Sequence, residues 1–113
     1  MLEVDRLVAV IKPKSPVLQW LKEQPEPIEN LNLETIQRDS TALLIPRFDG
    51  PNQAKEYIKQ IYLPIFEGEL AGWGVAKRHW PKERSYELFQ KWFEIEFHSM
   101  VFDIAYQDSQ ASA

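Results

Sequence analysis

Apolar residues along this chain fall into short blocks whose spacing predicts three strands. Residues 6–12, RLVAVIK, contain an unbroken apolar run with β-branched side chains, which is typical of a strand buried on both faces. Residues 41–45, TALLI, predict a second strand, which must end at Pro46 because proline has no N–H for a ladder hydrogen bond. Alternation of apolar and polar positions predicts a third strand over residues 96–104.

Helical spacing of apolar residues predicts the first two of three main helices between the first and third strands. The first is expected to begin at Ser15, a good N-cap, with Pro16 at the first helical position. The second begins at Pro51 and repeats apolar residues every three or four positions. Because Pro64 lies inside this second helix, we expect a kink or break near Leu63.

A third main helix is expected to begin at Ser85, whose hydroxyl can cap it. Trp80, just before this helix and followed by proline, is expected to pack onto it as a hydrophobic staple. Asn32 is expected to cap one further helical turn before the second strand. The inner face of the third helix is expected to hold Leu88, Phe89, Trp92 and Phe93.

The resulting order, β-α-β-α-α-β, predicts an α/β or α+β fold with a single-layer three-stranded sheet packed against three main helices. The link between the first two strands is long enough for a right-handed crossover, so we expect these strands to be parallel. The first strand is apolar throughout and is expected to lie in the centre, which gives the strand order 2-1-3. The direction of the third strand stays open.

Length and composition predict one globular domain over residues 1–113, because 44% of the residues are hydrophobic and 27% are charged. Its ordered part is expected over about residues 3–106, followed by a polar tail at 107–113. The chain contains no cysteine, which excludes disulfides, thiolate metal sites and cysteine nucleophiles. It contains no glycine-rich phosphate loop, and we expect no cofactor. Without a secretion signal or an apolar membrane span, a cytoplasmic protein is expected.

The net charge of −4 disfavours nucleic acid as a general partner, because phosphate binding needs a basic surface. The basic segment 77–84 is an exception, although a solvated loop is its simplest interpretation. It carries Lys77, Arg78, Lys82 and Arg84.

Both histidines and a serine lie in the aromatic-rich stretch 79–103, which raises the question of a catalytic site. His98 and Ser99 are neighbours on the predicted strand and must point to opposite faces, so a local Ser-His-Asp triad fails on geometry. Glu96 and His98 share one strand face and, with Glu94, form only a weak carboxylate–histidine set. We predict no metal site.

Polar residues at the strand ends are the one set of candidate site residues that the preceding arguments do not exclude. Lys12 ends the first strand, Arg47 and Asp49 follow the second, and Asp103 interrupts an apolar run in the third. A parallel third strand would bring Asp103 to Lys12 at the edge where open α/β sheets bind ligands. An antiparallel one would bring His98 and Glu96 there instead, near Lys12 and Arg47. Structural salt bridges are the simpler interpretation. The candidate ligand or partner contacts are His98, Lys12, Asp103, Arg47, Asp49 and Trp80.

The string WPKERSYELFQKWFEIEFHSMVFDI, residues 80–104, resembles a family of small bacterial proteins with a W-P-x-x-R and an H-S-x-V-x-D-L-like pattern. LLIPRFD and VAVIKPKSP are also similar to that family, so the resemblance covers residues 7–104. Ile104 stands where the pattern has leucine. The resemblance implies a bacterial cytosolic origin and a single domain, and it implies no activity, substrate or cofactor.

Three functions follow as hypotheses. The first is a non-enzymatic interaction or regulatory domain that associates with itself or another protein, because the chain has four tryptophans and ten other aromatic residues. It requires a large exposed apolar patch. The second is a small-molecule-binding protein or enzyme in which His98, Lys12 and Asp103 converge in a pocket. The third, weaker hypothesis is nucleic-acid contact through the basic segment.

Overall fold

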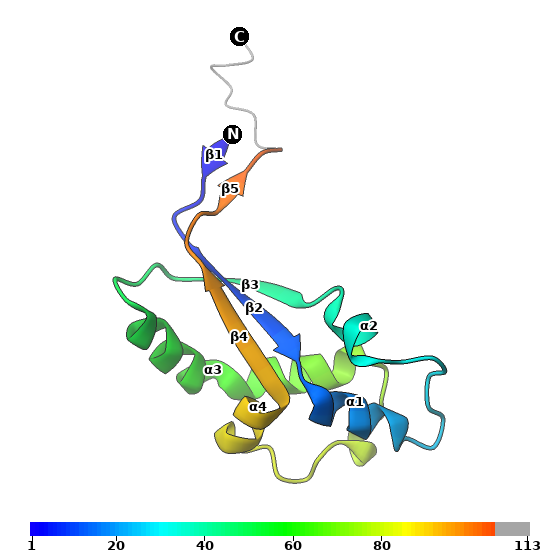
Figure 1. Cartoon of the computed structure of the whole chain (residues 1–113). Coiled ribbons are helices and arrows are strands. Elements are labelled where there is room, and N and C mark those ends of the chain that lie inside the picture. The colour runs from blue at the N-terminus through cyan, green and yellow to red at the C-terminus, as the bar shows by residue number, and fades with distance from the viewer. Residues whose placement is uncertain (106–113) are drawn as a thin grey trace.

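The computed structural model describes residues 1–105, so the tail predicted for 107–113 lies outside the described part. Helices and strands are mixed along the chain, as an α+β fold requires (Figure 1). The elements in order are β1 (Leu2–Glu3), β2 (Leu7–Pro13), α1 (Ser15–Lys22), α2 (Leu33–Gln37), β3 (Thr41–Ile45), α3 (Pro51–Gly72), the short 3-10 helix η1 (Lys77–His79), α4 (Tyr86–Trp92), β4 (Phe93–His98) and β5 (Phe102–Asp103).

The main sheet has the strand order β3-β2-β4, which confirms the predicted order 2-1-3 with the first apolar strand in the centre. The predicted parallel pairing of the first two strands is wrong. Leu7 pairs with Ile45 and Ile11 pairs with Thr41, so β2 and β3 are antiparallel. The reason is that α1 and α2 stay near the end at which β2 finishes, and the chain enters β3 at that same end without a crossover (Figure 1).

The predicted third strand is interrupted, and the expectation of a single three-stranded sheet is wrong. β4 begins at Phe93, directly after α4, so Phe93 belongs to the strand and not to the inner face of the helix. β4 runs antiparallel to β2, and β5 then pairs antiparallel with β1 in a second, two-stranded sheet.

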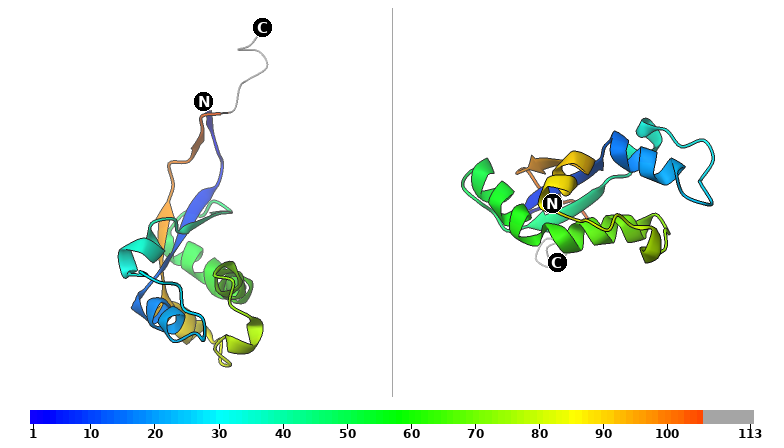
Figure 2. Two further views of the ribbon diagram at one scale, coloured as in Figure 1. Left: turned by 90° about the vertical axis from the view of Figure 1, so that its right-hand side faces the viewer. Right: turned by 90° about the horizontal axis from the view of Figure 1, so that it is seen from below.

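A β-bulge separates the two sheets. Leu2 pairs with Asp103 and Val8 pairs with His98. Five residues (3–7) therefore lie between these positions on the N-terminal strand, but only four (99–102) lie between them on the C-terminal strand. One extra residue bends the strand and increases its twist. Beyond the bulge, residues 1–5 and 99–105 form an arm that stands clear of the helices (Figure 2).

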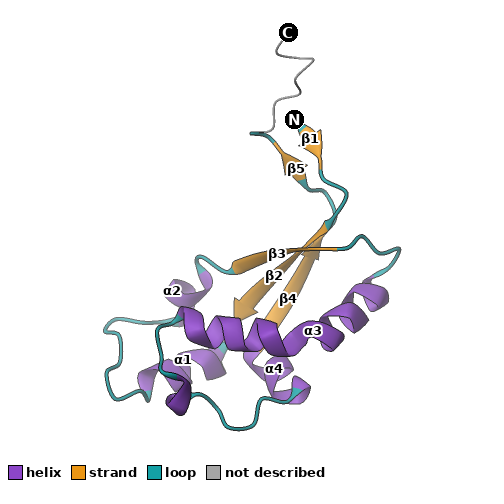
Figure 3. Cartoon of the chain, turned by 180° about the vertical axis from the view of Figure 1, so that it is seen from behind, coloured by secondary structure: helices purple, strands orange, loops and turns teal. Residues whose placement is uncertain are grey.

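Helices cover only one face of the main sheet, and α3 lies across that face (Figure 3). Alternate residues of β2, namely Leu7, Ala9 and Ile11, are buried in the core. Val8 and Val10 point the other way and are only half-buried, so β2 is not buried on both faces as its apolar run predicted. The core cluster contains Leu7, Ala9, Ile11, Val17, Trp20, Leu21, Ile36, Ile45, Ala54, Ile58, Phe66, Leu70, Phe89 and Phe93.

Two of the three predicted helix caps are confirmed. The Asn32 side chain accepts a hydrogen bond from the Thr35 N–H at 2.8 Å, and the Ser85 hydroxyl accepts one from the Leu88 N–H at 3.1 Å. Ser15 is not a cap, because it lies inside α1, which has no side-chain cap.

The helix α3 continues through Pro64 as one element of 22 residues, so the expected break is absent, although the helix bends along its length (Figure 3). Pro64 lies on the exposed side of the helix. The buried side chains of Ile58 and Phe66 hold the turns on either side of it against the sheet. Packing thus outweighs the hydrogen bond that the proline removes. No helix within residues 1–105 is long and apolar enough to cross a membrane.

Candidate functional site

Two of the predicted site residues meet through a third on the helix-free face of the sheet. The Lys12 ammonium donates to Glu96 Oε1 at 3.0 Å, and His98 Nε2 lies 3.5 Å from the other oxygen of the same carboxylate. The antiparallel direction of β4 produces this arrangement, as that alternative predicted. The hydrogen bond and charge of Glu96 raise the pKa of Lys12, and those of Lys12 lower the pKa of Glu96. The three side chains are partly exposed and lie on an open surface.

Asp103 does not join this cluster. It pairs with Leu2 in the arm, and its carboxylate accepts a hydrogen bond from the Ala105 N–H at 3.0 Å. Lys12 lies at the opposite end of β2, opposite Glu94. The predicted convergence of Lys12, His98 and Asp103 in one pocket is therefore wrong.

Arg47 binds the base of the arm instead of lying near Lys12. Its Nε donates to the Asp5 carboxylate at 3.0 Å, and its Nη2 lies within 3.4 Å of the carbonyl oxygens of Val4, Arg6 and Ser99. These groups belong to the two strands at the bulge, where the ladder is interrupted. Arg47 therefore replaces missing ladder hydrogen bonds and fixes the arm to the loop after β3.

Asp49 begins the turn into α3, where its backbone N–H donates to the Gln53 side-chain oxygen at 3.0 Å. Arg47 and Asp49 both border a shallow hollow at the start of α3. They share this hollow with Phe48 and Tyr57, whose rings contact at a centroid distance of 5.4 Å.

Trp80 stabilises the segment before α4. Its indole N–H donates to the Val75 carbonyl at 2.9 Å, and the charged groups of Lys77 and Arg84 lie 6.0 and 5.8 Å from its ring centroid. Arg84 also forms an ion pair with Glu67 at 3.3 Å. Two of the four basic residues of the segment 77–84 are thus engaged within the fold.

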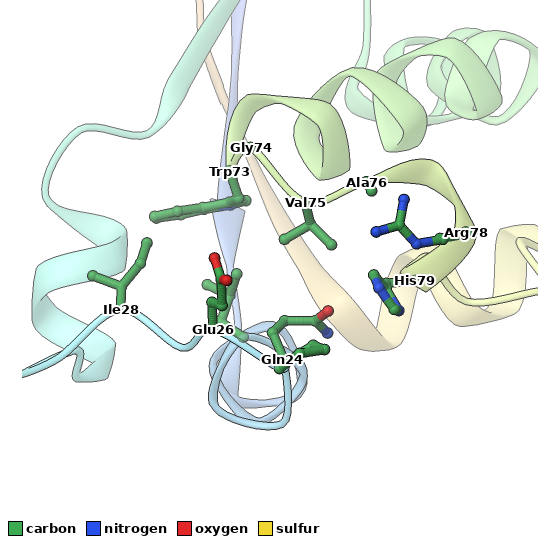
Figure 4. Close-up of a pocket in the computed structure, with 11 residues that line it drawn as sticks. Gln24, Glu26, Ile28, Trp73, Gly74, Val75, Ala76, Arg78 and His79 are labelled. Carbon is green, nitrogen blue, oxygen red and sulfur yellow. The ribbon is translucent and has the colours of Figure 1, made fainter.

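A cavity of about 300 Å³ opens between the loop that follows α1 and the loop that follows α3 (Figure 4). Its apolar walls include the buried Leu21, the indole of Trp73 and the side chain of Val75. Glu26 comes from one loop, and Arg78 with His79 from the other. The sequence analysis did not single out this cavity, because its two loops are some fifty positions apart. Gly72-Trp73-Gly74 is the one local signal, since Gly74 has a φ of +75° that only glycine adopts freely.

The exposed apolar side chains are concentrated on the arm. Five of the eight large apolar side chains that are exposed in residues 1–105 lie there: Met1, Leu2, Met100, Phe102 and Ile104. Leu44, on the helix-free face of the sheet, is a sixth. Within the same part of the chain, no three His, Asp or Glu side chains form a group that could hold a metal ion.

Comparison with protein-family models, with curated proteins and with solved structures gives no match for this chain.

Proposed function

We propose that this protein is a homotypic interaction module, in which the arm of one chain lies on the helix-free sheet face of a second copy. The observation that carries the proposal is the concentration of exposed apolar side chains on the arm. A two-stranded ribbon is at best marginally stable in water, and it needs a further strand or an apolar surface to pack against. The β1/β5 arm has neither within residues 1–105.

The same chain also carries an apolar surface that its own arm does not cover. Val8, Val10, Ala42 and Leu44 alternate with the core residues of β2 and β3 and point away from the helices. The arm continues in the direction of β2 and β4, away from this face (Figures 1 and 2).

A dimer with a two-fold axis would give each arm an apolar surface to pack against and would cover each helix-free sheet face. Each arm covers the partner's sheet face and has its own face covered in return, so the contact closes without further copies. Burial of apolar surface contributes roughly 25 cal/mol per Å² and drives such association. The proposed activity is binding, and the separation of Asp103 from Lys12 and His98 supports it over a catalytic site made of these three residues.

The test compares two variants in which glutamate replaces a partly exposed apolar side chain. Phe102, on the arm, is 43% exposed, and Leu63, on the outer side of α3, is 41% exposed. Sedimentation equilibrium or light scattering is expected to show a dimer for the wild type and for Leu63→Glu. Phe102→Glu is expected to be monomeric, because it places a charge in the apolar contact.

The circular dichroism spectrum and melting profile of each variant show whether the fold survives. A wild-type chain that stays monomeric at about 100 μM would overturn the proposal, since a specific interface should hold at that concentration. A Phe102→Glu variant as dimeric as Leu63→Glu would place the interface elsewhere and reject the arm.

Nucleic-acid contact is not favoured by any observation beyond the charge of the segment 77–84, and it stays a prediction. Arg84 is engaged with Glu67, and Lys77 lies over Trp80. Binding that weakens steeply with added salt would support it.

A further inference from the structure

The cavity between the loops that follow α1 and α3 combines apolar walls with charged side chains that have no partner within the described part of the fold. The side chains of Glu26, Arg78 and His79 make no hydrogen bond or ion pair with any residue in the described range. All three residues are exposed to solvent. Here groups of opposite charge lie on opposite walls of one concave, partly apolar site (Figure 4).

The wall formed by residues 73–79 is held in place before any ligand arrives. The Trp80 indole N–H donates to the Val75 carbonyl at 2.9 Å, and the Trp20 indole N–H donates to the His79 carbonyl at 3.1 Å. The backbone N–H of Gly74 donates to the Ala71 carbonyl at 3.0 Å, which the positive φ of Gly74 permits. A loop fixed at both ends loses little conformational entropy when it binds a ligand.

The opposite wall is similarly anchored. Gln24 lies just after the end of α1, and its side-chain amide donates to the Trp20 carbonyl at 2.8 Å. Pro25 and Pro27, on either side of Glu26, restrict the backbone of the loop. The loop thus presents the Glu26 carboxylate towards the Trp73 indole (Figure 4).

The lining defines the chemistry of a ligand. Trp73, Val75 and Ile28 offer an apolar surface that includes one aromatic ring face. Arg78 offers a planar donor group for a carboxylate, and Glu26 accepts hydrogen bonds from an ammonium group. A volume of about 300 Å³ is at the lower end of the range for small-molecule sites.

We propose that this cavity binds a small zwitterion with a planar apolar body, the class of the aromatic amino acids. The ring packs against Trp73, the carboxylate binds Arg78 and the ammonium group binds Glu26. The site is independent of the proposed self-association, since no residue of the arm lines it.

Three probes separate the contributions of the two charges: L-phenylalanine carries both, phenylacetate only the anion and phenethylamine only the cation. Binding is measured by calorimetry and by the shift of the Trp73 indole N–H resonance in the full-length protein. Arg78→Gln is expected to weaken L-phenylalanine and phenylacetate about tenfold and to leave phenethylamine unchanged. Glu26→Gln is expected to weaken L-phenylalanine and phenethylamine and to leave phenylacetate unchanged.

Lys82→Gln is the matched control, because it removes one positive charge from the same basic segment outside the cavity. Its affinity for all three probes is expected to equal that of the wild type. The proposal would be overturned if L-phenylalanine showed no saturable binding at concentrations up to about 10 mM. Any remaining affinity would then correspond to less than about 3 kcal/mol of binding free energy. Equal effects of Arg78→Gln and Lys82→Gln would also overturn it, because the charge would then act only through the general field of the segment.

Discussion

At the scale of single residues, side chains whose partners are close in sequence behave as their identity predicts. Asn32 and Ser85 cap helices because the N–H groups they satisfy lie only three residues away. Glu69 behaves differently. It lies half-buried on α3 near Thr41 of β3, and burial raises its pKa, an effect that hydrogen bonding to Thr41 only partly offsets. Its position three residues after the buried Phe66 places it on the side of α3 that faces the sheet, unlike the exposed Glu56 of the same helix.

The raised pKa of Glu69 predicts a stabilising substitution. The folded state disfavours the charged carboxylate, so stability falls as pH rises through the interval between the unfolded and the raised folded pKa. Glu69→Gln removes that charge and is expected to increase the free energy of unfolding at pH 7 by up to about 1 kcal/mol, or roughly 4 °C in Tm. The gain is expected to shrink as the pH falls through the unfolded pKa of about 4.3 and to be absent near about pH 3, where the carboxyl is almost fully neutral in both states.

Thermal unfolding followed by circular dichroism across pH 3–8 checks this outcome. Glu56→Gln is the control, because Glu56 lies on the same helix but is exposed. A destabilised Glu69→Gln variant at pH 7 would show that the carboxylate takes part in an interaction worth more than its desolvation cost.

At the scale of elements, the interruption between β4 and β5 decides the shape of the molecule. Without the bulge, β1 and β5 would continue the ladder of β2 and β4 without a break. With it, they leave as an arm whose base is held by Arg47. The strand predicted over 96–104 includes both pieces, because the alternation of side chains continues along these residues, and the extra residue of the bulge lies on the other strand, within residues 3–7.

Arg47→Ala is expected to loosen the arm while the core stays folded. It removes the hydrogen bonds to Asp5 and to three backbone carbonyls, which leaves the bulge groups to water. Amide hydrogen exchange of residues 2–4 and 101–103 is expected to accelerate at least tenfold, with little change in β2 and α3. Arg6→Ala is the control, because Arg6 is an exposed arginine next to Asp5, whose carboxylate binds Arg47. Equal protection of the arm in both variants would mean that Arg47 does not hold it.

At the scale of the whole molecule, the layers are unequal: helices cover one face of the main sheet and leave the other open (Figures 1 and 3). A three-stranded sheet covered on one side keeps apolar side chains such as Val10 and Leu44 in contact with water. In the proposed dimer, association of two copies would remove both this surface and the arm from solvent. Stability and oligomeric state are then linked.

This linkage predicts a melting temperature that depends on protein concentration. A dimer that dissociates on unfolding gains about 1.4 kcal/mol for each tenfold rise in concentration, which corresponds to a few degrees in Tm. The wild type is expected to show this rise between about 1 and 100 μM in differential scanning calorimetry, and Phe102→Glu is expected to show none. A wild-type Tm that does not change over this range would contradict self-association.

The sequence by itself determined the features that depend on neighbouring residues. These are the central apolar strand, the starts of α3 and α4, the absence of thiol chemistry and the strand order, which follows from the apolar character of residues 7–11. Helical and strand periodicity, caps and prolines act over a few positions, so a local pattern is sufficient.

Only the tertiary structure decided the pairing of strands and the contacts between residues that are far apart in the sequence. The antiparallel pairing of β2 and β3 depends on where α1 and α2 pack, and the bulge depends on how two strands ninety positions apart align. The same holds for the sites: the sequence predicts Arg47 as a polar strand-end residue, but its contacts lie on two distant chain segments, residues 4–6 and Ser99. The cavity joins Glu26 to Arg78 through the packing of α1 beside the end of α3. Such contacts are set by the burial of the whole core, and no local pattern encodes them.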